Sequence, residues 1–247
     1  MMVKARSSMI ATSGSSVAIA TTRSERLAVA EFRRKVSVRE GYISADLSRR
    51  HFPDSYDFQP TTIILCAQRQ GKIIGSLRLH TGLSSPLEEL VDSRPFYARG
   101  EAAEISRLCV EPEERSQGLA QELIASASRL AAEQGITYLL FLAIAGIKQK
   151  CGLEYLPLIG DCSRKPPISP YFSFTETEEQ LYQKLAAVTL PGWYGRLGAK
   201  PAGYLFLHPV FNTVNLPMYG EVKSTRSESA IPVRKSKPVL DESCFCL

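Results

Sequence analysis

EISRLCVEPEERSQGLA, residues 104–120, is the stretch that decides the expected fold. Its first seven residues are mostly apolar and stop at Glu111 and Pro112, which is typical of a buried strand that ends at a proline. An acidic loop follows. Gly118 then opens a segment, up to Gln134, in which leucine and alanine recur at helical spacing. The stretch predicts a strand, a glycine loop and a helix in direct succession.

The glycine loop has the properties of an anion site. A glycine at a helix start lets a ligand approach the backbone, and the N–H groups of the first turn point outward. The helix dipole favours negative charge there, and Arg115 can add a charge-assisted contact to a phosphate. The residues that we expect to bind the phosphate of a cofactor are Val110, Arg115, Gln117, Gly118, Leu119 and Ala120.

Strand and helix patterns alternate on both sides of this stretch. Residues 61–67 (TTIILCA) and 73–79 predict an antiparallel hairpin around Gly71, and the apolar run 136–144 predicts a strand buried on both faces. This alternation indicates one α/β domain with a mixed sheet. We expect further helices at 25–38, 87–91, 146–150 and 177–188, a strand at 203–208 and a loop at 42–59.

The two ends differ in composition from this middle part. Residues 1–22 are rich in Ser, Thr and Ala and are expected to be disordered, and residues 220–247 form a polar tail. We therefore expect one domain over residues 23–219. The last four residues, CFCL, match a prenylation box, but so short a match is more often chance.

Charge and composition exclude several classes of protein. The formal net charge is +5 and the basic residues are scattered, so we expect no nucleic-acid partner. The three histidines and six cysteines lack metal-ligand spacing, so we expect no metal. No apolar run is long enough for a membrane span, no signal peptide is recognisable, and the cysteine pattern indicates no disulfide framework. A cytoplasmic protein is the resulting prediction.

Two segments resemble the GNAT acyltransferases. The strand, the acidic loop, the pattern Arg-x-x-Gly-x-Ala at 115–120 and the helix resemble the pyrophosphate loop of that family. Residues 148–154, KQKCGLE, resemble the segment after the fifth strand. The family often has a tyrosine, a general acid for the departing thiolate, where this chain has Lys148. The resemblance implies the GNAT fold, a mixed and mostly antiparallel sheet flanked by helices.

A narrower resemblance spans residues 25–175. Acyl-homoserine-lactone synthases and long-chain N-acyl amino acid synthases share an arginine-rich first helix, an acidic pair, a strand arginine and the motif Glu-x-Ser-Arg. Here the motif is Glu104 to Arg107, and PYF at 170–172 resembles the amino acid synthases. The resemblance implies that Glu104 and Arg107 are catalytic. The substrate-binding candidates that it implies are Arg33 or Arg34, with Arg34 assigned, and Asp54, Asp57 and Arg78.

Each of these residues could have a structural role instead of a catalytic or binding one. Glu104 could be the general base that deprotonates an amine, because burial makes a carboxylate a better proton acceptor. It could equally pair with Arg78 or Arg107. The two arginines could bind a substrate carboxylate or hold Asp54 and Asp57, and the acidic pair could instead bind an ammonium or sulfonium group.

The implied activity is transfer of an acyl group from a thioester to an amine, most plainly that of an amino acid. The expected donor is an acyl carrier protein, through its phosphopantetheine thioester, or acyl-CoA. Basic residues on the first helix and the following loop would dock the carrier protein. Backbone N–H groups near 108–110 would polarise the thioester, and Leu139, Phe141 and Leu142 could line an acyl channel. Alternatives are an acyl-homoserine-lactone synthase, an acetyl-CoA N-acetyltransferase and a non-catalytic thioester-binding protein.

Overall fold

One sheet organises the protein. The computed structural model describes residues 11–12, 15–82, 84–98, 101–147, 158–160 and 165–222. The strands of this part follow the order β1-β2-β3-β4-β5-β6-β9-β7, and β8 also pairs with β9. Every pair is antiparallel except β5 with β6, so the expected mixed and mostly antiparallel sheet is confirmed. The strands are β1 Ala11–Thr12, β2 Ser15–Ile19, β3 Thr62–Arg69, β4 Lys72–His80, β5 Ala102–Val110, β6 Tyr138–Ile147, β7 Lys200–Pro201, β8 Phe206–Leu207 and β9 Thr213–Glu221.

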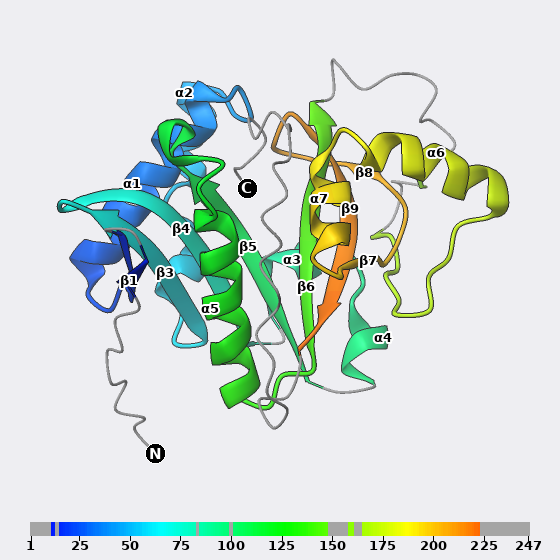
Figure 1. The fold of residues 1–247 in the computed structure, drawn as a ribbon, viewed down its shortest axis with the longest axis horizontal. Helices are drawn as coiled ribbons and strands as arrows, with labels where there is room; N and C mark the ends of the chain where they lie inside the picture. Colours follow the sequence, from blue (N-terminus) through cyan, green and yellow to red (C-terminus); the bar gives the residue numbers. More distant parts are fainter. Residues whose placement is uncertain are drawn as a thin grey trace.

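Helices cover both faces of the sheet (Figure 1). Leu140 and Phe141 are neighbours on β6 and so point to opposite faces. Leu140 packs with Leu87 of α3, whereas Phe141 packs on Tyr194 of α7. The helices are α1 Arg23–Arg39, α2 Ala45–His51, α3 Pro86–Leu90, α4 Arg94–Tyr97, α5 Leu119–Glu133, α6 Glu176–Ala186 and α7 Leu190–Arg196, with 3-10 turns η1 Ser55–Phe58 and η2 Pro112–Glu114.

Local sequence explains where the two longest helices begin. Thr22 caps α1 through a capping box with Glu25, which satisfies free N–H groups of the first turn. Helix α5 begins after Gly118, whose φ of 83° lies in the left-handed region that glycine adopts without strain. Both helices match the predicted ones to within a few residues.

The chain has more regular structure than the sequence pattern predicts. Strand β2 lies within the segment expected to be disordered and pairs with β3 from Ser16↔Gln68 to Ile19↔Leu65. Residues 42–59 are not a loop, because they hold α2 and η1, whose first turns are capped by Ser44 and Asp54. Both elements are too short to show an apolar period. The helix predicted at 146–150 falls on residues 146–147, which belong to β6, and otherwise lies outside the described residues.

Strands β5 and β6 separate, and this opens the sheet. They pair only from Ala102↔Tyr138 to Glu104↔Leu140, and beyond these residues they diverge towards their carboxyl ends (Figure 1). Strand β5 also carries a bulge, because its register against β4 changes from Arg78↔Ser106 to Ser76↔Cys109. The parting of the two strands creates room for a ligand in the middle of the sheet.

Candidate active site

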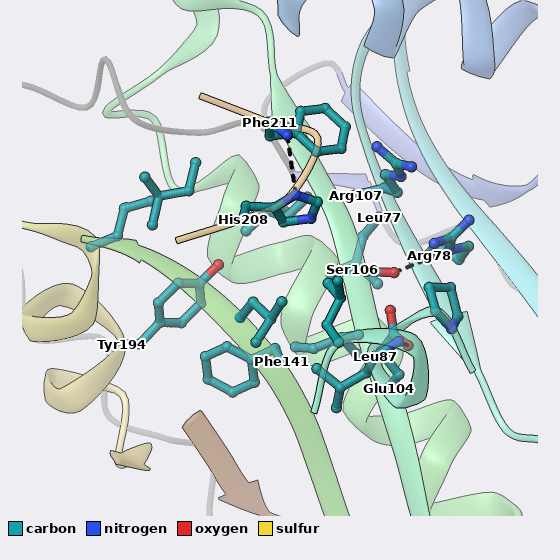
Figure 2. Close-up of a pocket in the computed structure, with 17 residues that line it drawn as sticks. Leu77, Arg78, Leu87, Glu104, Ser106, Arg107, Phe141, Tyr194, His208 and Phe211 are labelled. Carbon is teal, nitrogen blue, oxygen red and sulfur yellow. Dashed lines mark hydrogen bonds between the residues drawn. The ribbon is translucent and has the colours of Figure 1, made fainter. Parts of the chain in front are cut away.

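A cleft lies where β5 and β6 part, and it encloses about 770 Å³, counting the open space at its mouth. Residues from both faces of the sheet line it, among them Glu104 on one face and Phe141 on the other. The cleft therefore passes between the two strands instead of lying on one face (Figure 2). The polar side chains along its wall are Arg78, Glu104, Ser106, Arg107, Tyr194 and His208.

Glu104 is buried at the closed end of the cleft, with 4% of its surface exposed. Its Oε2 accepts a hydrogen bond of 2.7 Å from the backbone N–H of Leu87, in the first turn of α3. Within the described residues the carboxylate makes no ion pair with Arg78 or Arg107 at 4 Å or less. The carboxylate thus makes no direct ion pair with either arginine there, although its charge helps to raise the pKa of Arg78, and it accepts from the first turn of a short helix.

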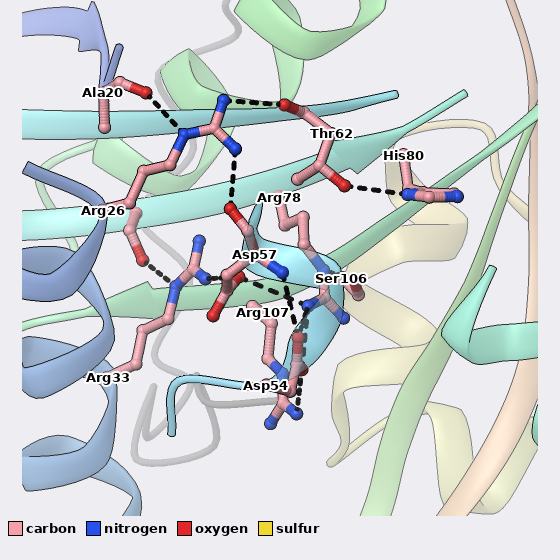
Figure 3. Close-up of polar contacts among 11 residues, drawn as sticks. Ala20, Arg26, Arg33, Asp54, Asp57, Thr62, Arg78, His80, Ser106 and Arg107 are labelled. Carbon is pink, nitrogen blue, oxygen red and sulfur yellow. Dashed lines mark hydrogen bonds and ion pairs between the residues drawn. The ribbon is translucent and has the colours of Figure 1, made fainter. Parts of the chain in front are cut away.

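A buried cluster of three arginines and two aspartates lies beside the cleft (Figure 3). Arg33 Nη1 lies 3.0 Å from Asp57, and Arg78 Nη1 lies 2.7 Å from Asp54 and 3.3 Å from Asp57. Arg107 Nη2 donates to Asp54 at 2.8 Å. Ser76 and Ser106 accept from the Nε atoms of Arg33 and Arg78. The cluster carries one more positive than negative charge.

The carboxyl group of Asp54 in this cluster stays ionised. Burial alone would raise the pKa of the Asp54 carboxyl group, but the charges and hydrogen bonds of Arg78 and Arg107 hold that pKa well below its usual value. Both carboxylate oxygens of Asp54 already accept hydrogen bonds from arginines. This favours the structural role of the acidic pair over binding of an ammonium or sulfonium group.

Of the two arginines considered on the first helix, the structure brings Arg33 into the cluster. Arg33 is 1% exposed, whereas Arg34 lies on the outer face of α1 and pairs with Glu31 at 2.7 Å. Arg34 is therefore not placed to contact a substrate in the cleft. The two residues are adjacent, so they must lie about 100° apart around the helix, and only the buried one reaches the sheet.

Arg107 joins the cluster to the cleft. Its φ of 55° is in the left-handed region, which costs free energy for a residue with a Cβ, and it sits at the bulge. Its Cζ lies 4.6 Å from the ring centroid of Phe52 and 5.3 Å from that of Phe211. Such contacts stabilise a guanidinium group. With 12% of its side chain exposed, Arg107 presents a positive charge on the wall of the cleft.

His208 and Tyr194 line the cleft but were not predicted as site residues. His208 Nδ1 accepts hydrogen bonds of 3.1 Å from the backbone N–H groups of Val210 and Phe211. The proton of a neutral ring is therefore on Nε2, by assignment from its partners. Neither residue lies in or beside a recognisable motif. Only the apolar pattern around Tyr194 could have indicated that its side chain is buried.

A second, small hollow of about 190 Å³, counting the open space in front of it, lies at the amino-terminal end of α5. Ser116 and Gly118, with φ of 61° and 83°, turn the backbone around it, which is a favourable geometry for an anion. Val110, Arg115, Gly118, Leu119 and Ala120, five of the six residues expected to bind a phosphate, line it. The side chain of Gln117 instead contacts Glu113 and Arg69, and that of Arg115 folds back onto Val110 and Glu40, 3.2 Å away.

The features above define a class of protein. A sheet split between a parallel strand pair, with a glycine turn and a helix start directly after the first of these strands, is the arrangement expected of the GNAT fold. In agreement, the chain superimposes on FeeM, an N-acyl amino acid synthase from uncultured soil microbes, with a TM-score of 0.53 at 13% identity, over 84% of this chain and 91% of that one. This likeness establishes the fold.

A particular family also matches. The model of the FeeM N-acyl amino acid synthases matches residues 28–143, just under half of the chain, and this range holds every predicted site residue. No curated protein sequence matches. Other similar structures are an acyl-CoA N-acyltransferase from Pseudomonas aeruginosa (17% identity, 86% and 99% coverage, TM-score 0.47) and the acyl-homoserine lactone synthase BjaI (17%, 84% and 82%, 0.46). The predicted resemblance is confirmed, and it supports an N-acyltransferase.

The predictions of no metal site and of no membrane span can be compared with the structure only over the described residues. Among them, no group of three metal-ligating side chains could hold a metal ion. No helix of that part combines the length and the apolar surface needed to cross a membrane. Lys148 and the rest of the segment 148–154 lie outside these residues.

Proposed function

We propose that the protein transfers an acyl group from a thioester to the amino group of an amino acid. The observation that carries the proposal is that Glu104 and Arg107 line the same cleft, while Arg115 and Gly118 line a second hollow at the start of α5. An amino acid offers an amine and a carboxylate a few ångströms apart. The guanidinium group of Arg107 can bind the carboxylate, and the carboxylate of Glu104 can accept a proton from the amine.

In the proposed reaction, Glu104 takes a proton from the ammonium group, which frees the nitrogen lone pair. The amine then attacks the thioester carbonyl carbon, forming the C–N bond while the C–S bond breaks. The thiolate of the donor takes up the second proton that the nitrogen releases and leaves as the free thiol. Arg107, with Arg78 behind it, orients the acceptor carboxylate. Asp54 and Asp57 hold these guanidinium groups in place. Backbone N–H groups near 108–110, at the bulge, stabilise the oxyanion.

The hollow at the start of α5 is the proposed site for the phosphate of the donor. Its backbone supplies the N–H donors, and Arg115 would exchange Glu40 for the phosphate. The donor is an acyl carrier protein or acyl-CoA. Helix α2 lies at the same end of the molecule as the start of α5 (Figure 1). It carries the exposed residues Arg49 and Arg50, whose charge favours an acidic carrier protein. The cytoplasm remains the expected compartment, because Cys66 and Cys109 form no disulfide in the described part of the chain.

The deciding experiment incubates the protein with a mixture of amino acids and either long-chain acyl carrier protein or acyl-CoA, and detects products by mass spectrometry. An N-acyl amino acid is the expected product. Tight thioester binding without product from any donor would support the non-catalytic alternative. Reversing the charges of Arg49 and Arg50 to Glu should slow transfer from the carrier protein and spare transfer from CoA. If the substitutions changed the rates with the two donors by the same factor, α2 would have no part in docking the carrier protein.

A further inference from the structure

The serine of the Glu-x-Ser-Arg motif has no role in the steps above. Ser106 lines the cleft together with Glu104 and Arg107 (Figure 2). Its Oγ accepts a hydrogen bond of 3.0 Å from Nε of Arg78. Because that N–H group occupies one lone pair, the hydroxyl hydrogen must point elsewhere, and no residue of the described part accepts it. Ser106 thus has one donor to offer to a ligand.

A second serine of the cluster makes the same contact without facing the cleft. Ser76 accepts from Nε of Arg33 at 2.9 Å, much as Ser106 accepts from Arg78. Ser76 is completely buried, however, and is not part of the cleft lining. Of the two serines, Ser106 is therefore the one whose hydroxyl group can meet a ligand. Holding an arginine explains Ser76 in full, but it does not explain why Ser106 faces the cleft.

The bulge brings the neighbour of Ser106 to the same side of the sheet. In a regular strand Ser106 and Arg107 would point to opposite faces. Arg107, in the left-handed conformation, instead bonds to Asp54. Asp54 also binds Arg78, the arginine that Ser106 holds. Two adjacent residues of β5 therefore offer a guanidinium group and a hydroxyl group on one side of the sheet, and such donors suit an anionic oxygen.

Glu104 determines which end of an amino acid would face Ser106. The two residues are two positions apart on β5, before the bulge, so their side chains lie on the same face with Cα atoms roughly 7 Å apart. An α-amino acid carries its nitrogen and its carboxylate a few ångströms apart, so with a hydrogen bond at each end it can span the two side chains. With the nitrogen at Glu104, the carboxylate lies at Ser106.

We propose that Ser106 is a substrate-binding residue, whose hydroxyl group donates a hydrogen bond to the carboxylate of the acceptor beside Arg107. The proposal rests on the proposed function for the identity of the acceptor as an amino acid. The hydrogen bond from Arg78 polarises the hydroxyl group and makes it a better donor. A site that pairs its own polar groups with a carboxylate rejects an acceptor without one, because those groups are then left unpaired. Ser106 thus helps to select amino acids over plain amines.

Binding of two product-like molecules tests this without turnover. The probes are N-decanoyl-L-leucine and N-decanoyl-3-methylbutylamine, which differ only in the carboxylate, so the ratio of their dissociation constants isolates its recognition. A leucine side chain suits the mostly apolar lining, to which Leu87, Leu108 and Phe141 contribute. Isothermal titration calorimetry should show that the unaltered protein prefers the acid. Ser106→Ala should reduce this preference roughly tenfold or more, as loss of a hydrogen bond to a charged group implies.

Ser76→Ala is the matched control, because it removes the equivalent contact to an arginine away from the cleft, and it should keep the full preference. Arg78 stays in place in Ser106→Ala, since its Nη1 is still bound to Asp54 and Asp57. A full preference in Ser106→Ala, an equal loss in Ser76→Ala, or an unaltered protein that binds neither probe or both equally would overturn the proposal. Failure to form any N-acyl product would count against acyl transfer and would leave the binding ratio interpretable.

Discussion

The carboxylate of Glu104 accepts a hydrogen bond of 2.7 Å from the backbone N–H of Leu87, so one side chain both caps α3 and faces the cleft. These two roles separate in Glu104→Gln. The amide oxygen can still accept from Leu87, but it cannot take a proton. We expect kcat to fall about 10²- to 10⁴-fold with an unchanged melting temperature, measured by product formation and thermal unfolding.

The companion variant Glu104→Ala removes both roles. It should lose activity to the same extent and also lose roughly 1–3 kcal/mol of unfolding free energy, because the Leu87 N–H is left without its partner. Full activity in Glu104→Gln would show that the carboxylate only supports α3.

Arg33 and Arg34 form a natural pair for testing the buried cluster. Removing Arg33 leaves the Asp57 carboxylate buried with less compensation, so Arg33→Met should cost about 3–5 kcal/mol of unfolding free energy. Arg34→Met breaks only a surface pair with Glu31 and should cost about 0–1 kcal/mol. Urea unfolding of the two variants measures this. Similar losses would mean that the cluster does not hold the first helix on the sheet.

The same pair shows how far sequence could predict this molecule. Long elements with a strong period, such as β3, β4 and α5, were predicted because their apolar spacing is local information. The burial of a charged residue on the inner face of α1 was not predicted. Arg33 is buried there because it bonds to Asp57 and Ser76, which lie in distant segments of the sequence. Arginine ordinarily lies on the surface. The sequence alone therefore favoured neither residue strongly.

The C-terminal contribution to the cleft was missed for a related reason. Tyr194 lies on the short helix α7 and His208 directly follows the short strand β8, and both reach the site through contacts between distant segments, such as Tyr194 on Phe141 and β8 on β9. No motif marks them, and Pro217 inside β9 obscures its strand pattern. The glycine loop, by contrast, was located to the residue because Gly118 and its flanking strand and helix are contiguous.

Arg107 should determine recognition of the acceptor carboxylate. Arg107→Ala removes a charge-assisted contact, so the KM for an amino acid should rise roughly 10- to 100-fold while the KM for the donor stays constant. The control substrate is the amine that lacks the carboxylate. The intact protein should use that amine poorly, and the variant should use it no worse than the intact protein does. A uniform loss on both acceptors would instead indicate that Arg107 only supports the bulge.

The arginine cluster predicts a dependence of stability on pH. Arginines hold the pKa of the Asp54 carboxyl group below its value in the unfolded chain, which is about 3.9. This stabilisation is present above that value and is lost as the pH falls towards the folded-state pKa, because the unfolded chain takes up the proton first. Unfolding free energy should therefore drop more between pH 6 and pH 3 in the unaltered protein than in Asp54→Asn. Parallel pH curves would contradict this.

His208 supports the cleft through its Nδ1 atom, and two substitutions separate that atom from the rest of the ring. His208→Asn keeps an acceptor oxygen near the Nδ1 position, so the backbone N–H groups of Val210 and Phe211 stay bonded. His208→Ala leaves them unpaired and should cost roughly 1–3 kcal/mol. Because the Phe211 ring packs against both His208 and Arg107, the alanine variant should also raise the KM of the amino acid. Thermal unfolding and acceptor kinetics on both variants measure these effects. If His208→Asn loses as much unfolding free energy as His208→Ala, the stabilising contact is made by Nε2 and not by the hydrogen bonds of Nδ1 to the loop.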